Sequence, residues 1–189
     1  MINKALKVRI YPNKIQQKKI DTTINCCRFV RNHMIERNRK LYNRRKEHLN
    51  YNTMQNLLPV MKKYLPWLVK ADSQALKYAC RQVDDAYQRF FKKLSRYPQF
   101  RSKRESVQSY TTTNVKAIHY ETGCVKIPCI GWVKAKDNRE LPLGSKICQV
   151  TITRDHEQYY ACICYKVDED VITEQIDENN VVGLFFGSS

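Results

Sequence analysis

The spacing of apolar residues changes once along this chain, near residue 105, and this change limits the folds that the chain can adopt. Before it, apolar residues recur at helical spacing, as Leu76, Cys80 and Val83 do. After it, apolar and polar residues alternate, as they do around Ala161. Helical spacing is typical of an amphipathic helix, and strict alternation is typical of a half-buried strand. The sequence therefore predicts a helical block followed by a set of strands.

One more strand is predicted at the start of the chain, where apolar residues alternate with lysine and arginine over residues 4–10. It has no strand neighbour among the helices, so we expect it to join the later strands. Several short strands separated by turn residues are typical of a small barrel or sandwich. The predicted fold class is α+β, with a small antiparallel β-barrel built from residues 1–11 and 106–167 and a helical block inserted at residues 12–105.

The helical block is expected to contain three helices. Asn13 and Gln16 have the spacing of a capping box that begins the first helix, and the pattern leaves open whether Asn25 breaks that helix in two. A shorter helix is predicted over residues 53–64. The third helix has the clearest apolar stripe, and Asp72 or the serine after it is expected to cap it.

Positive charge is concentrated in the predicted helical part. The chain carries 34 Lys and Arg, 18 Asp and Glu, and a formal net charge of +16. Residues 1–105 hold 26 of these bases and 7 of the acids, a net charge of +19, whereas the remainder has a net charge of −3. Such a surface favours a polyanionic partner over an ordinary solvated face, because solubility needs far less charge.

A basic loop at residues 96–104 carries Tyr97 and Phe100 among its arginines and lysine. Two interpretations stay open for these aromatic residues: they stack on a base or ribose, or they fill the core at a hinge. The residues that we expect to contact phosphates are Arg28, Arg31, Arg101, Lys103 and Arg104.

The sequence offers no catalytic or metal-binding pattern. The 8 cysteines include no CxxC pair, the 4 histidines are scattered, and no phosphate-binding loop or nucleophile elbow is present. The start of the chain does not look like a signal peptide, and no segment is apolar enough for a membrane span. We therefore expect a cytoplasmic protein with free thiols, no catalytic residues, and no metal ion or cofactor held by this chain.

Several motifs together resemble the N-terminal half of the TnpB/OrfB proteins of insertion sequences. They run in the family order: Lys7-Val-Arg-Ile-Tyr-Pro12, Cys27-Arg-Phe-Val-Arg-Asn32, Ala86-Tyr-Gln-Arg-Phe-Phe91, Pro98-Gln-Phe-Arg-Ser-Lys103 and Ile130-Gly-Trp-Val-Lys134. The resemblance implies a transposon-encoded RNA-guided DNA endonuclease related to type V CRISPR effectors. It implies that the barrel is a wedge domain and the helices a recognition block. Its partners would be a guide RNA and target double-stranded DNA with a short adjacent motif.

In the resemblance, the readers of the adjacent DNA motif come from the helical block and the nearby side of the barrel. Polar residues at the predicted helix starts and loop ends of these regions are therefore candidates to contact base edges. They are Tyr51, Gln55, Ser73, Lys77 and Asn114. An alternative is that Ser73 only caps its helix and Tyr51 only packs.

The end of the chain carries two further expectations. Residues 168–180 contain six acids and no base, which is typical of a solvated linker. Residues 181–189 resemble the start of a RuvC-like nuclease domain, with Phe185 at the place of its first metal-binding aspartate. The resemblance therefore implies that magnesium and zinc sites belong to a missing C-terminal half. The chain is expected to be a truncated, nuclease-inactive binding protein, a free-standing regulator or partner subunit, or the product of a decayed reading frame.

Overall fold

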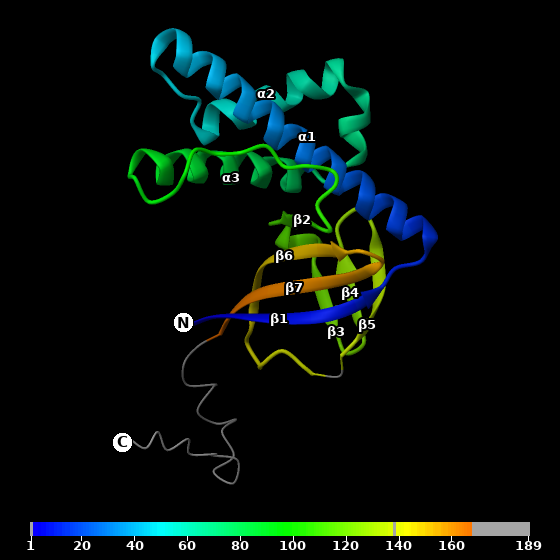
Figure 1. Ribbon diagram of the computed structural model, residues 1–189. Helices are drawn as coiled ribbons and strands as arrows, with labels where there is room; N and C mark the ends of the chain where they lie inside the picture. Colours follow the sequence, from blue (N-terminus) through cyan, green and yellow to red (C-terminus); the bar gives the residue numbers. More distant parts are fainter. Residues whose placement is uncertain (1, 138, 168–189) are drawn as a thin grey trace, which may run out of the picture.

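A computed structural model describes residues 2–137 and 139–167, so the predicted linker at 168–180 and the predicted RuvC-like start lie outside the described residues. Three helices lie above a curved sheet (Figure 1). The helical elements are α1 (Lys14–Arg45), α2 (Tyr51–Tyr64), the 3₁₀ helix η1 (Pro66–Lys70), α3 (Ser73–Phe91) and the 3₁₀ helix η2 (Val115–Ala117). The strands are β1 (Ile2–Tyr11), β2 (Val107–Thr112), β3 (His119–Glu121), β4 (Cys124–Ile127), β5 (Gly131–Lys136), β6 (Lys146–Asp155) and β7 (Gln158–Val167).

All seven of these strands form one antiparallel sheet in the order β2-β6-β7-β1-β5-β4-β3. The α+β class is confirmed, but the closed barrel is not, because the edge strands β2 and β3 do not pair with each other in the described sheet. The sequence pattern did not predict β3, which is only three residues long. So short a strand shows no clear alternation, and it offers few backbone groups with which a second edge could pair.

The first strand joins the later strands as predicted. β1 pairs with β7 along Ile2–Ile10 and with β5 along its last three residues. Leu6 and Val8 point to the core, opposite Ile163 and Ala161 of β7, and all four are buried. The intervening residues of β1 are exposed. Burial of one face therefore fixes the register of β1, since a slip of one residue would bring lysine and arginine into the core.

The first helix is continuous over its 32 residues, so the break at Asn25 that the sequence left open does not occur. The capping box is present, because the side chain of Asn13 accepts from the backbone N–H of Gln16 and the side chain of Gln16 accepts from that of Asn13. Asn25 lies on the exposed side of the helix, where its amide oxygen accepts a hydrogen bond from Arg28 at 2.8 Å. A polar residue satisfied at the surface does not compete with the helical backbone.

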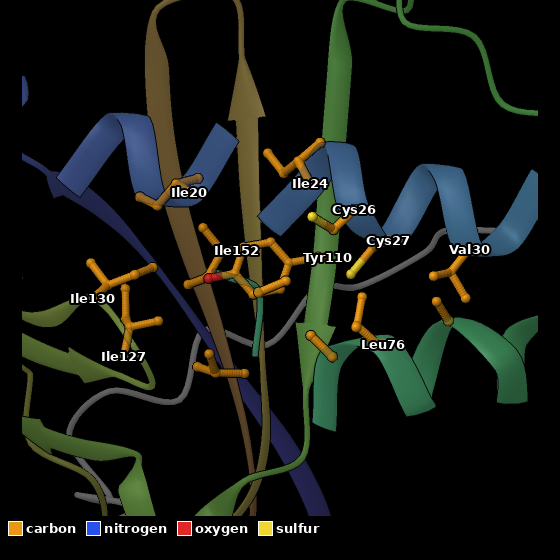
Figure 2. Close-up of a cluster of buried hydrophobic side chains, with 14 of the residues drawn as sticks. Ile20, Ile24, Cys26, Cys27, Val30, Leu76, Tyr110, Ile127, Ile130 and Ile152 are labelled. Atoms are coloured by element: carbon orange, nitrogen blue, oxygen red, sulfur yellow. The ribbon is translucent and has the colours of Figure 1, made fainter. Parts of the chain in front are cut away.

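The third helix begins at the predicted cap and connects the helices to the sheet. The carboxylate of Asp72 accepts from the backbone N–H of Gln74 at 3.0 Å and also from the Thr112 hydroxyl at the end of β2. Figure 2 shows Tyr110 of β2 inserted between the helices and the sheet, close to Cys27 of α1. The helices and the sheet thus share one core. The division into a barrel domain and a recognition domain remains a prediction.

All eight cysteines are free, and three of them are buried. Burial raises the pKa of the Cys27 thiol far above its ordinary range and that of Cys80 to about 12. These thiols therefore stay protonated and pack as small apolar groups. Among the described residues, no helix is long and apolar enough to cross a membrane.

Candidate nucleic-acid interface

Three of the predicted phosphate-contacting residues line one hollow. Arg28 and Arg31 come from α1, one helical turn apart, and Arg101 comes from the loop that leads from α3 to β2. The hollow has a volume of about 180 Å³ and is bounded by α1, α3, this loop and β2. Residues three apart on a helix project from the same face, so α1 presents both of its arginines on one side. We call this site the arginine hollow.

Arg28 is held in place by two amide side chains. Its guanidinium donates at 2.8 Å to the amide oxygen of Gln108 on β2 and at 2.8 Å to that of Asn25. These contacts fix the direction of the guanidinium without neutralising its charge, because both acceptors are neutral. A held, uncompensated guanidinium is well suited to receive a phosphate oxygen.

Arg31 differs from the other two arginines in its burial and in its hydrogen bonding. Its Nε atom is buried and has no hydrogen-bond partner among the described residues. Burial and the nearby charge of Arg101 lower its pKa to about 10, while Glu105 acts in the opposite direction. The side chain still carries its charge at neutral pH. The hollow therefore keeps a cationic donor whose hydrogen bonding is incomplete, which costs stability until an acceptor arrives.

The basic loop is anchored by two residues that the sequence analysis did not select. The side-chain amide of Asn32 both donates to the backbone carbonyl of Arg101 and accepts from its N–H, each at 2.9 Å. The amide of the buried Gln108 donates to the carbonyls of Lys103, at 2.6 Å, and Glu105, at 3.1 Å. Asn32 closes one of the quoted family motifs, so that signal was available; nothing in the sequence pattern marks Gln108.

The rest of the loop resolves the two interpretations of its aromatic residues. Tyr97 is half-buried, its hydroxyl lies 2.9 Å from that of Tyr87, and its ring packs edge-on against Phe90. Phe100 is 50% exposed. Tyr97 therefore fills the core, while Phe100 is available for stacking. The predicted phosphate contacts Lys103 and Arg104 lie beside the hollow, exposed at the turn that ends the loop.

The five predicted base-contacting residues fall into two groups. The first group lies near the start of α3. The Ser73 hydroxyl accepts from the ammonium of Lys62 at 2.7 Å. The backbone N–H of Asn114 donates to the hydroxyl of Thr112, which itself binds Asp72, the cap of α3. Lys77 lies one turn further along α3.

The other two, Tyr51 and Gln55, lie at the opposite end of α2. Arg81 lies over the ring of Tyr51 at 4.9 Å, so α2 runs antiparallel to α3. The side-chain amide of Gln55 donates to the amide oxygen of Asn52 at 3.3 Å. The structure therefore places Ser73 and Asn114 at the start of α3 and Tyr51 beside Arg81, about 12 Å further along that helix, with Lys77 between the two positions.

Comparison with known proteins agrees with the motifs. Residues 1–47 match the OrfB_IS605 model described as "Helix-turn-helix domain". The chain is 27% identical to a "Putative RNA-guided DNA endonuclease" of Streptomyces pristinaespiralis, over 98% of the chain and 46% of that relative. The resemblance to the TnpB/OrfB family is confirmed. A second relative, "Putative RNA-guided DNA endonuclease InsQ" of Escherichia coli K12, is 23% identical over 97% of the chain and 45% of its own length. The chain thus spans about half the length of the curated relatives it matches.

The description of the OrfB_IS605 match differs from the geometry of the matched segment. Residues 2–47 contain strand β1 and the single helix α1, and the first turn between two helices lies at residues 46–50. A DNA-binding helix-turn-helix places its second helix in the major groove, and the matched segment contains no second helix within its described residues. The contacts of α1 itself, and not a helix-turn-helix geometry, therefore indicate what its basic surface binds.

Proposed function

We propose that this chain is the nucleic-acid-binding portion of a TnpB/OrfB-like, transposon-encoded RNA-guided DNA-binding protein. Its partners are a guide RNA and target double-stranded DNA with a short adjacent motif. The observation that carries the proposal is the arginine hollow, where three guanidinium groups converge and Arg31 keeps a buried donor without a partner among the described residues. A phosphate oxygen of the nucleic-acid backbone supplies the missing acceptor.

The charges around the hollow support a polyanion over a small ligand. Lys103 and Arg104 lie on the exposed turn beside it, and Glu105 is the single carboxylate among its described lining residues. A second, open groove lies beside the hollow, shares Arg31 and Arg101 with it, and leads along α3 toward Arg89 and Lys92. A track of successive cations suits a chain of phosphates, because each phosphate meets a new positive charge as the backbone advances.

Substitution of the arginines that line the hollow tests this proposal. Because Asn32 holds only the main chain of Arg101, Arg101→Ala removes the guanidinium and leaves the loop anchored. We expect Arg28→Ala and Arg101→Ala each to weaken binding to duplex DNA and to structured RNA about tenfold in a mobility-shift assay. Lys70→Ala, which removes an exposed charge from η1, is the matched control and should change binding less than twofold. Full affinity in the arginine variants would contradict the proposal.

We further propose that this chain does not cut DNA by itself. Two-metal nuclease chemistry needs several carboxylates around the ions, and the matching position, Phe185, lies outside the described residues. We expect no Mg²⁺-dependent cleavage of a guided duplex by the purified chain, and none after Phe185→Asp. Cleavage above the rate in buffer, by either protein, would overturn this part of the proposal.

A further inference from the structure

One face of the sheet combines aromatic and basic side chains away from the core. Register places Tyr11, Trp132 and Tyr160 on it, since Tyr11 lies opposite Lys134, two residues from Trp132, and Tyr160 lies opposite Arg9. Trp132 is 43% exposed and Tyr11 47% exposed, and Tyr160 is half-buried. Strands β7, β1 and β5, which carry these rings, lie side by side below the helices in Figure 1. We call this surface the outer sheet face.

Each ring on this face has a cation against it. The ammonium of Lys7 lies 4.8 Å from the ring centre of Tyr160, the guanidinium of Arg9 lies 5.4 Å from that of Tyr11, and the ammonium of Lys126 lies 5.9 Å from that of Trp132. These contacts hold the rings in place and leave part of each ring accessible.

The charge of the outer sheet face has one sign along its central strands. The sequences of β1, β5 and β7 contain no aspartate or glutamate. The basic residues on the face are Lys7, Arg9, Lys126, Lys134, Lys136, Lys146 and Lys166. Its two carboxylates on the described strands, Asp155 of β6 and Glu121 of β3, lie toward the edges of the sheet. An ordinary solvated sheet face mixes both signs, because like charges directly across strands repel. An anionic partner would relieve that repulsion.

We propose that the outer sheet face binds an unpaired segment of RNA, with bases stacked on Trp132, Tyr11 and Tyr160 and phosphates on the surrounding lysines and arginine. The reason is the spacing of the rings. Neighbouring rings lie on adjacent strands and two residues apart along the strand direction. The diagonal distance between their backbone positions is about 8 Å. Rings spaced in this way on a sheet accept successive splayed bases, a mode in which unpaired RNA is commonly recognised. Duplexes have no exposed base faces to stack.

This inference depends on the proposed function in one respect: both take RNA as a partner of the chain. The site itself is separate from the arginine hollow, because the hollow is formed by α1, α3, β2 and the basic loop, whereas the rings lie on β1, β5 and β7. Stacking on the face and phosphate contact in the hollow can therefore be removed independently.

A fluorescence experiment tests the proposal directly. The chain has two tryptophans, so Trp67→Phe leaves Trp132 as the only one. We expect a 12-nucleotide oligouridylate to quench Trp132 emission on binding, and an abasic strand with the same backbone to bind more weakly without quenching. Oligouridylate that binds without quenching, or an abasic strand that quenches equally, overturns the proposal. Stronger quenching by oligothymidylate than by oligouridylate overturns the assignment to RNA.

Variants separate this proposal from the proposed function. We expect Trp132→Ala and Tyr160→Ala each to weaken oligouridylate binding about tenfold and to leave duplex DNA binding within twofold. Tyr64→Ala, which removes an aromatic ring that is 75% exposed on α2, is the matched control. Unchanged oligouridylate binding in both face variants overturns the inference alone. A wild-type protein that binds neither RNA nor DNA overturns the proposed function and this inference with it.

Discussion

At the scale of single residues, Arg31 shows a conflict between stability and binding. Its guanidinium is desolvated, lies near Arg101, and has an unpartnered Nε among the described residues. Its pKa is lowered from 12.5 to about 10, so the folded state disfavours the charged form. A base with a lowered pKa destabilises the fold at every pH at which it is charged, so this cost is fully present below about pH 10.

This conflict predicts opposite effects of one substitution. Arg31→Leu removes the buried charge and keeps an apolar side chain, so we expect the melting temperature to rise by a few degrees. We expect the same variant to lose about tenfold in affinity for duplex DNA. Thermal unfolding at pH 7 and mobility shifts measure the two effects. A lower melting temperature together with unchanged affinity would show that Arg31 is a structural residue.

At the scale of elements, the basic end of the loop between α3 and β2, residues 101–105, is held by amide side chains. Gln108 has two separate tasks, since its oxygen accepts from Arg28 while its nitrogen donates to the carbonyls of Lys103 and Glu105. Loops of this kind keep functional side chains in place although their own side chains are exposed. The position of the basic residues therefore depends on β2 as much as on the loop itself.

Two variants of Gln108 distinguish these tasks. Gln108→Glu keeps an acceptor for Arg28 and loses the amide donor, so we expect faster hydrogen exchange in residues 101–105. Gln108→Leu loses both contacts and should also weaken nucleic-acid binding more than Gln108→Glu does. The free energy of unfolding should fall by about 0.5–1.5 kcal/mol in Gln108→Leu, because the carbonyls of Lys103 and Glu105 lose a hydrogen-bond donor. Equal protection of the loop in all three proteins would contradict this account.

The separation of the predicted base-contacting residues also belongs at this scale. Because Lys77 lies on α3 and Gln55 lies on α2, we expect Lys77→Ala and Gln55→Ala to relax preference at different positions of the DNA motif. Selection of a randomised duplex library by each variant measures this. Retention of the wild-type preference in both variants, or no preference in the wild type, would refute the assignment of these residues to base contacts.

The sequence predicted elements better than it predicted how they close or combine. Alternation in β1 and the capping box at Asn13 are local signals, and both are confirmed. Local signals do not say whether two edge strands meet, so the closed barrel was not confirmed. The arginines of α1 were found from charge, but their convergence with Arg101 depends on contacts across the chain made by Asn32 and Gln108. Such contacts leave no periodic pattern.

At the scale of the whole molecule, charge determines how binding depends on salt. The formal net charge is +16, made up of +19 in residues 1–105, which contain the three α-helices, and −3 in the remainder. If about six phosphates are neutralised, affinity should fall about a thousandfold between 50 and 200 mM salt. Neutralising Arg101, Lys103 and Arg104 together should make that dependence shallower. Affinity that stays constant across this range of salt would contradict a phosphate-dominated interface.

The pairing of β1 with β7 has a consequence for the order in which the protein can fold. Ile2 lies opposite Val167, so the first described strand waits for the last described one. Until then most of β1 lacks a strand to pair with, since β5 pairs only with its last three residues, and contacts so distant in sequence form slowly. The helices between them can form early, because their contacts are local. We therefore expect completion of the sheet to be the late step in synthesis, and nascent chains released before residue 158 to aggregate or recruit chaperones.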